Sequence, residues 1–275
     1  MKNITTCMNK LFAVAMGFLM FSSAAIANPE DVNKPLLLIG ASYADGRIPF
    51  NDALVAPLFG ISVGFGSYLS LGDALIKDPR LPGYVINEAQ AGATTFDRAG
   101  CNPGPGCNAG QWQGYDKQLI KAKARVTIPG TPIVLAKYVV ITMGNDCLHS
   151  DAFGVPQNQT SPCTPSEMNA AVDRLLAIGQ QALDAGLIPI FDMYPAYNDL
   201  NLPLAQQMFG LIWIADSANY NFLRDLQRSR ISAELPGAVM LDIWADFHHM
   251  GDGLHPDDKT ARKAAAAIAQ YIIQH

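Results

Sequence analysis

The sequence predicts an α/β fold in which one doubly wound domain is built on a parallel sheet. Five short apolar runs suited to buried strands alternate with longer segments whose apolar residues recur at helical spacing. The connections between strands have the lengths of right-handed crossovers, which join parallel strands. No internal repeat, low-complexity tract or linker interrupts the chain, so we expect a single domain.

The five expected strands are bounded by glycine, proline or polar residues. In the first, four large aliphatic residues at 36–39 lie between Pro35 and Gly40, which suits a strand buried on both faces. Pro189 indicates that the fourth strand lies near an edge of the sheet or at a strand start. The expected strands cover residues 36–39, 84–87, 137–143, 187–191 and 238–243.

Helices are predicted between the strands from apolar spacing and from capping residues. The clearest start is Thr164-Pro165-Ser166-Glu167, which offers an N-cap, a proline at the first helical position and a capping-box glutamate. Gly186 ends that helix. We expect helices over 67–78, 165–185, 208–226 and from Pro256 onward, and loops over 43–66, 100–110 and 147–163.

The first 27 residues have the arrangement of a secretory signal peptide. Two lysines precede an apolar run over 11–21, and small residues lead to Ala25-Ile-Ala27. The apolar run is too short to stay in a bilayer as an anchor. We therefore expect cleavage near Ala27 and an exported protein, periplasmic or extracellular, with no stable membrane anchor and one domain over 28–275.

The charge balance narrows the range of partners. The chain has 19 Lys and Arg against 24 Asp and Glu, and loss of Lys2 and Lys10 with the leader leaves 17 basic residues. An acidic surface makes nucleic acid or an anionic membrane an unexpected partner. The sequence predicts no particular oligomeric state.

Four cysteines remain after the leader, namely Cys101, Cys107, Cys147 and Cys163. An even count in an oxidising compartment indicates two disulfides, and three connectivities are possible. We favour Cys101 with Cys107 and Cys147 with Cys163, because each pair would close one loop. Zinc is the alternative, but no C-x-x-C spacing is present.

Groups able to carry chemistry follow four of the five strands. Ser42 follows the first, Gly92 the second, Asn145 the third, and Asp252 with His255 the fifth. In an open α/β sheet such groups meet at the carboxyl ends of the strands. Acyl transfer needs a hydroxyl, an imidazole, a carboxylate and donors for an oxyanion. Taken alone, the stretch at Ser42 favours a turn or capping residue over a nucleophile.

Four motifs carry a resemblance to a known family. Gly40-Ala-Ser42, Gly92, Gly144-Asn145-Asp146 and Asp252-Gly-Leu-His255-Pro256 resemble, in order and context, the four sequence blocks of the SGNH or GDSL hydrolase superfamily. The resemblance covers nearly the whole chain after the leader. It implies a flavodoxin-like α/β/α sandwich with a five-stranded parallel sheet, and no metal or organic cofactor.

The resemblance also implies roles for these residues. Ser42 would be the nucleophile and His255 the general base, with Asp252 orienting the imidazole. The oxyanion hole would consist of the backbone amides of Ser42 and Gly92 and the side-chain amide of Asn145. One departure is Ala41, which stands where the family usually has aspartate, so the loop holding Ser42 lacks one polar anchor.

Other residues offer competing sites. Ser62 lies in a Gly-x-Ser-x-Gly elbow, but that motif needs a strand before it and a helix after it, and Pro57 and Gly66 oppose both. The histidines at 248 and 249 lie close to Asp252 and His255 in the chain, and spacing alone leaves zinc open. We expect both to be rim residues.

Asp146 presents a similar choice, because an acid beside Asn145 could act on substrate or hold the loop. We expect a loop-stabilising acceptor.

The main prediction is an exported serine hydrolase that cleaves a small-molecule carboxylic ester through an acyl-enzyme on Ser42. The apolar stretch over 48–68 could line an acyl pocket for lipid or simple aliphatic esters, or be ordinary core packing. The alternatives are a carbohydrate O-acetyl esterase and, in another class, a non-catalytic sugar- or lipid-binding module on the same fold.

Overall fold

The computed structural model describes residues 33–45, 69–99, 111–144, 146–147, 163–209 and 216–275. The leader, the apolar stretch over 48–68, Ser62, Asn145 and the pair Cys101 and Cys107 lie outside the described residues. What the sequence indicates for them therefore stays a prediction. Among the described helices, none has the length and apolar character that a membrane crossing requires.

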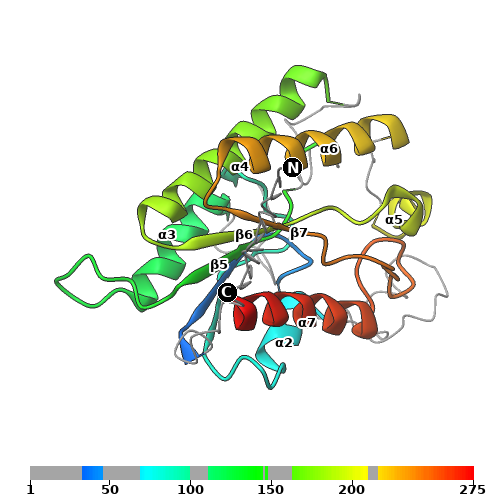
Figure 1. Cartoon of the computed structure of the whole chain (residues 1–275). Helices are drawn as coiled ribbons and strands as arrows, with labels where there is room; N and C mark the ends of the chain where they lie inside the picture. Colours follow the sequence, from blue (N-terminus) through cyan, green and yellow to red (C-terminus); the bar gives the residue numbers. More distant parts are fainter. Residues whose placement is uncertain (1–32, 46–68, 100–110, 145, 148–162, 210–215) are drawn as a thin grey trace, which may run out of the picture.

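A five-stranded parallel sheet forms the centre of the molecule (Figure 1). Its order is β2-β1-β5-β6-β7, and every neighbouring pair is parallel. Taken in chain order this is 2-1-3-4-5, the flavodoxin-like order, so the predicted fold class is confirmed. The strands are β1 (Leu36–Ile39), β2 (Val85–Asn87), β5 (Tyr138–Ile141), β6 (Ile188–Asp192) and β7 (Val239–Leu241).

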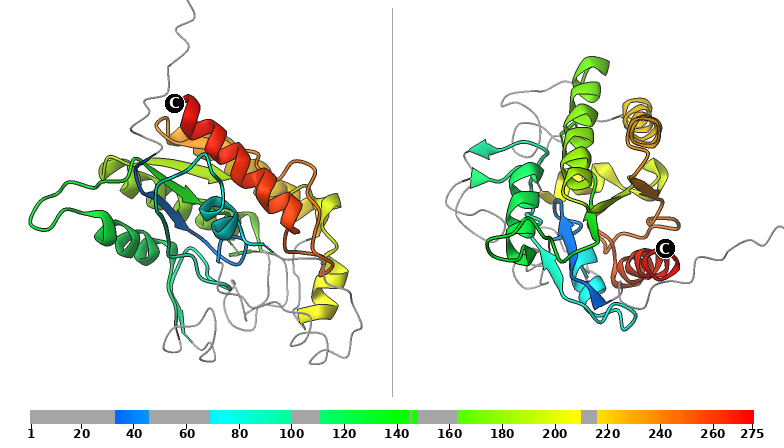
Figure 2. Two further views of the ribbon diagram at one scale, coloured as in Figure 1. Left: turned by 90° about the horizontal axis from the view of Figure 1, so that it is seen from below. Right: turned by 60° about the vertical axis from the view of Figure 1, so that its left-hand side comes forward.

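Helices cover both faces of the sheet and complete an α/β/α sandwich. Helices α2 and α7 pack together on one face, whereas α3, α4 and α6 lie on the other (Figures 1 and 2). The helices are α2 (Leu71–Ile76), α3 (Tyr115–Val126), α4 (Pro165–Asp184), α5 (Leu202–Phe209), α6 (Ser217–Glu234) and α7 (Asp258–Gln274).

Strands β1 and β5 are neighbours in the interior of the sheet. All residues of β1 and β5 are buried, with Leu36 paired to Tyr138 and Ile39 to Ile141. Continuous apolar runs are what a strand covered by helices on both faces requires. Pro189 is the second residue of β6, which lies between β5 and β7. It therefore marks the start of a strand and not the edge of the sheet.

The capping box predicted at the start of α4 is confirmed. Thr164 accepts from the backbone of Glu167, whose carboxylate accepts from the backbone of Thr164, and α4 begins at Pro165 as predicted. The last helix begins two residues later than expected, at Asp258, because Asp257 is its N-cap.

Several elements differ from the sequence prediction. Helix α3 was not predicted, because Gly114 gives its start no side-chain cap. The pattern over 208–226 was expected to be one helix, but α5 ends at Phe209 and Asp216 caps a new helix, α6. A small antiparallel pair, β3 (Arg98–Ala99) with β4 (Gln111–Trp112), was also not expected.

Candidate active site

The turn that follows β1 carries Ser42 and can be made only with glycine at position 40. Gly40 has φ +150°, and a Cβ on it would lie 1.7 Å from Thr142 Oγ1. Its backbone N–H donates to the buried Gln118 Oε1 at 2.8 Å. The close approach of β1 and β5 at this end of the sheet therefore determines where the next residues lie.

Hydrogen bonds within the turn hold Ser42, whose side chain is half-buried. The carbonyl of Ala41 accepts from the backbone N–H groups of Ala44 and Asp45, both at 3.0 Å. The Asp45 side chain is fully buried, and its Oδ2 accepts from Ala91 N at 2.7 Å. A carboxylate four positions after Ala41 thus anchors this turn, although Ala41 stands where the family that the motifs resemble usually has aspartate.

The loop after β2, which carries Gly92, lies against the Ser42 turn. Gln90 N donates to Gly40 O at 3.0 Å, next to the Ala91–Asp45 bond. Gly92 is buried and has φ 78°, a conformation that favours glycine. The structure therefore brings together the two segments predicted to supply the backbone amides of an oxyanion hole.

Asp252 and His255 form a buried pair in the loop between β7 and α7. His255 Nδ1 lies 2.6 Å from Asp252 Oδ2, and the two residues are 4% and 0% exposed. Asp252 Oδ1 accepts from Leu254 N at 2.8 Å and from His255 N at 2.9 Å. This contact through Nδ1 makes Nε2 the ring nitrogen that can exchange a proton with another group.

The carboxyl of Asp252 is kept in its ionised form. Burial acts to raise its pKa, but the charge of His255 and the hydrogen bonds from His255 and the loop backbone outweigh burial and lower the pKa. An ionised carboxylate at this position orients the imidazole and stabilises it when it becomes protonated.

Tyr43, the residue after Ser42, joins the first turn to the histidine loop. Its hydroxyl donates to Leu254 O at 2.6 Å, and its ring centroid lies 5.9 Å from that of His255. The same ring packs edge-on against Trp244 at 5.2 Å. Two segments more than 200 positions apart in the sequence therefore meet beside the candidate nucleophile.

The backbone just before Asn145 is held by three buried side chains. Met143 N donates to Asp192 Oδ1 at 2.6 Å, and Met143 O accepts from the Tyr115 hydroxyl at 2.7 Å. The hydroxyl of Tyr194 donates to the carbonyl of Gly144. Although Asn145 itself lies outside the described residues, the strand end that leads to it is fixed.

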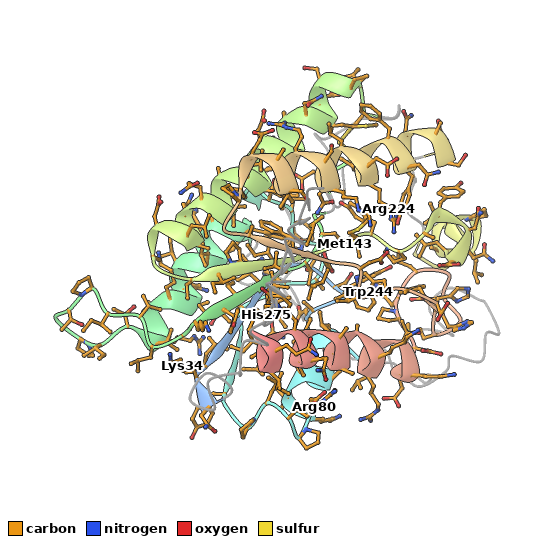
Figure 3. All side chains as sticks on the ribbon, viewed as in Figure 1. Lys34, Arg80, Met143, Arg224, Trp244 and His275 are labelled. Atoms are coloured by element: carbon orange, nitrogen blue, oxygen red, sulfur yellow. A yellow bond between two sulfur atoms is a disulfide. The ribbon has the colours of Figure 1, made fainter. Side chains whose placement is uncertain are left out.

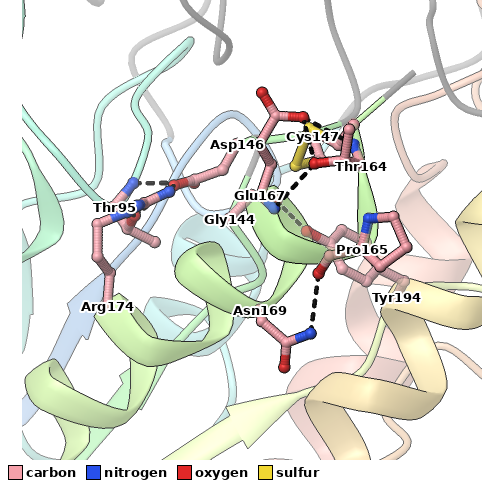
Figure 4. Close-up of a disulfide and its surroundings, with 11 residues drawn as sticks. Thr95, Gly144, Asp146, Cys147, Thr164, Pro165, Glu167, Asn169, Arg174 and Tyr194 are labelled. Carbon is pink, nitrogen blue, oxygen red and sulfur yellow. Dashed lines mark hydrogen bonds and ion pairs between the residues drawn. A yellow bond between two sulfur atoms is a disulfide. The ribbon is translucent and has the colours of Figure 1, made fainter.

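Asp146 holds the other side of the same loop, as predicted (Figure 4). Its carboxylate is buried and accepts from the backbone and hydroxyl of Thr95 and from Arg174 Nη2, the last at 2.8 Å. The disulfide between Cys147 and Cys163 follows at once, with Cα atoms 5.7 Å apart. One of the two predicted disulfides is thereby confirmed, and Asp146 stabilises the loop.

Asp192 is a site residue that the sequence interpretation missed. It ends β6 fully buried, and its two oxygens accept from Met143 N and from Trp244 Nε1, the latter at 3.0 Å. Figure 3 labels both donors, Met143 and Trp244. Burial raises the pKa of Asp192 to about 7, which the two hydrogen bonds only partly oppose. The available signal was its position, because it ends the one strand to which no functional group had been assigned.

The zinc alternative for the histidine loop finds no support in the geometry. Within the described ranges, no group of three or more His, Cys, Asp or Glu side chains is placed to hold a metal ion. His248 is exposed, as a rim residue should be. His249 differs from the expectation, because its Nδ1 accepts from the backbone N–H groups of Gly251 and Gly253.

No protein-family model and no curated protein matches this chain. Solved structures do match it. Est24, a carbohydrate acetylesterase from Sinorhizobium meliloti, is 16% identical to this chain with a TM-score of 0.54, and the match covers 87% of this chain and 98% of Est24. An aryl esterase from M. smegmatis is 15% identical with a TM-score of 0.52, covering 87% and 98%. At this level of identity the likeness concerns the fold. The chain therefore shares its α/β fold with these two solved structures, in agreement with the fold class that the sequence predicted.

Proposed function

We propose that the protein is a serine hydrolase that cleaves carboxylic esters through an acyl-enzyme on Ser42. The observation that carries the proposal is the buried Asp252–His255 pair, with Nδ1 and Oδ2 2.6 Å apart, in a loop that Tyr43 joins to the Ser42 turn. This arrangement supports the proposal, because nucleophilic catalysis uses a carboxylate, an imidazole and a hydroxyl.

The proposed reaction has two halves. The Ser42 hydroxyl attacks the ester carbonyl while His255 Nε2 takes its proton, and Asp252 stabilises the imidazolium that results. The proton then passes to the leaving alcohol, and water removes the acyl group from Ser42 with His255 again acting as base. The backbone amides of Ser42 and Gly92 and the side chain of Asn145 would donate to the oxyanion.

Labelling with a fluorophosphonate tests the nucleophile directly. We expect the modified peptide of the wild-type protein to contain Ser42, and labelling and hydrolysis of p-nitrophenyl acetate to be lost in Ser42→Ala. His255→Ala should lose hydrolysis by a factor on the order of 10³ or more. Ser62→Ala is the matched control and should keep both. Full turnover in Ser42→Ala would refute the assignment, and absence of labelling together with absence of turnover would favour a binding module.

For the substrate, lipid or simple aliphatic acyl esters remain the first candidate. A carbohydrate O-acetyl ester is the second, and the activity named for the Sinorhizobium meliloti structure favours it. Two measurements distinguish these substrate classes. The first compares the rates on p-nitrophenyl acetate and octanoate, and the second measures the release of acetate from acetylated xylan. Preference for octanoate without acetate release supports the first substrate class, and the opposite pattern supports the second.

Export is also part of the proposal, and it rests on the leader-like residues 1–27. Expression of the full chain in a bacterial host followed by N-terminal sequencing of the extracytoplasmic protein should give a start near Asn28. An uncleaved protein retained in the cytoplasm would contradict it.

A further inference from the structure

We propose that His249 is a positioning residue that holds the loop of the catalytic pair in its working conformation. Its Nδ1 accepts two hydrogen bonds, from Gly251 N at 3.1 Å and from Gly253 N at 3.2 Å. These two amides lie on either side of Asp252. The inference rests on the proposed function, because it assigns His249 a role in the same reaction.

The hydrogen bonds define the state of the His249 ring. A ring nitrogen that accepts from N–H groups carries no proton, so the proton of the neutral imidazole lies on Nε2. The half-buried side chain therefore acts as an acceptor for the backbone. Nδ1 accepts hydrogen bonds from backbone N–H groups of the loop, as a backbone carbonyl oxygen does in a helix or a strand.

This loop needs contacts that hold it, because its two glycines give the backbone wide conformational freedom. Gly251 and Gly253 have φ 115° and 83°, which other residues rarely adopt, and glycine loses more conformational entropy than any other residue when it is fixed. A Cβ on Gly253 would also lie 2.2 Å from Asn201 O. Glycine is thus required at position 253, and contacts with other residues have to hold it in place.

Two contacts hold the amide and the carbonyl of Gly253 from different directions. The first is the His249 ring, and the second is Asn201 N, which donates to Gly253 O at 2.8 Å at the start of α5, beside this loop in Figure 1. At the base of the loop, Met250 N donates to His255 O at 2.9 Å. Asp252 lies between these points, so loss of the His249 contacts frees the backbone that carries the carboxylate.

Hydrogen exchange of individual amides tests this hold without reference to activity. We expect the Gly251 and Gly253 amides to exchange at least tenfold faster in His249→Ala than in the wild type. His249→Asn should restore protection, because Asn Oδ1 is as many bonds from Cα as His Nδ1. His248→Ala is the matched control, since that exposed side chain makes none of these bonds. If His249→Ala does not fold, His249→Gln replaces it, because its amide lies one atom further out.

Ester hydrolysis by the same variants tests the consequence. A misplaced carboxylate should lower kcat on the order of tenfold to a hundredfold in His249→Ala, with KM little changed and activity recovered in His249→Asn. Unchanged exchange in His249→Ala, no recovery in His249→Asn, or faster exchange with unchanged kcat would each overturn the proposal. If the wild-type protein hydrolyses no ester, the proposed function fails, and the exchange rates then decide alone whether His249 holds the loop.

Discussion

The buried carboxyl of Asp192 should make the stability of this protein fall as pH rises. Its pKa is about 7 in the folded protein against an ordinary 3.8, because burial penalises the charge more than the Met143 and Trp244 hydrogen bonds favour it. Between these values the folded protein holds a proton that the unfolded chain has lost. Since the folded state binds more protons there, the free energy of unfolding falls with increasing pH through this window.

The size of the effect follows from the two pKa values. One unit of pKa corresponds to about 1.4 kcal/mol, so the ionised carboxylate lowers the free energy of unfolding by about 4 kcal/mol when Asp192 is fully deprotonated. Between pH 5 and pH 8 the expected loss from this group alone is about 3 kcal/mol.

Urea unfolding followed by tryptophan fluorescence at pH 5 and pH 8 measures this loss. Asp192→Asn cannot titrate, so its stability should change between the two pH values by about 3 kcal/mol less than that of the wild type. The substitution has a cost of its own, because one of the two N–H donors then faces an amide group. That cost is the same at both pH values, so it cancels when the changes in stability with pH are compared. Asp225→Asn, at an exposed position of α6, should behave as the wild type does. Equal pH dependence in Asp192→Asn and the wild type would refute the reasoning.

Three further substitutions test other contacts of the site. Gly40→Ala places a methyl group 1.7 Å from Thr142 Oγ1 and should lower the free energy of unfolding by more than about 2 kcal/mol. Gly130→Ala is the control: Gly130 has φ +77° and nothing within 4 Å, so this substitution should cost only about 1 kcal/mol. Equal losses in urea unfolding would contradict this prediction. Cys147→Ser opens a disulfide across 16 positions and should cost about 3 kcal/mol and reduce the effect of a reductant on Tm; a reductant effect as large as in the wild type would count against it. Tyr43→Phe removes one hydroxyl donor but keeps the ring, so we expect a loss of about 1 kcal/mol and a severalfold lower kcat; an unchanged kcat would separate this bond from catalysis.

The fold could be predicted because the signals that determine it are local. A parallel sheet covered on both faces requires continuous apolar strands, and residues 36–39 and 138–141 have that composition. Helix α4 carries its capping box within four residues. Where a local signal was absent, as at Gly114, the helix that follows was missed.

The site divides in the same way. Ser42, Gly92 and the Asp252–His255 pair are placed by strand ends and short spacings, so the sequence indicates where they lie. The residues that hold them are recognised only through partners far away in the chain. Asp192 meets Met143 across 49 positions and Trp244 across 52, and Gln118 meets Gly40 across 78. No periodicity or motif encodes contacts of that range.

The Tyr43–Leu254 hydrogen bond has a consequence for the order of folding. It spans 211 positions, so it joins the Ser42 turn and the histidine loop from distant parts of the chain. Contacts of such sequence separation carry a large loop-closure cost and form slowly. During refolding, helical ellipticity should therefore return before ester hydrolysis does, and recovered activity would report that both ends of the domain have come together.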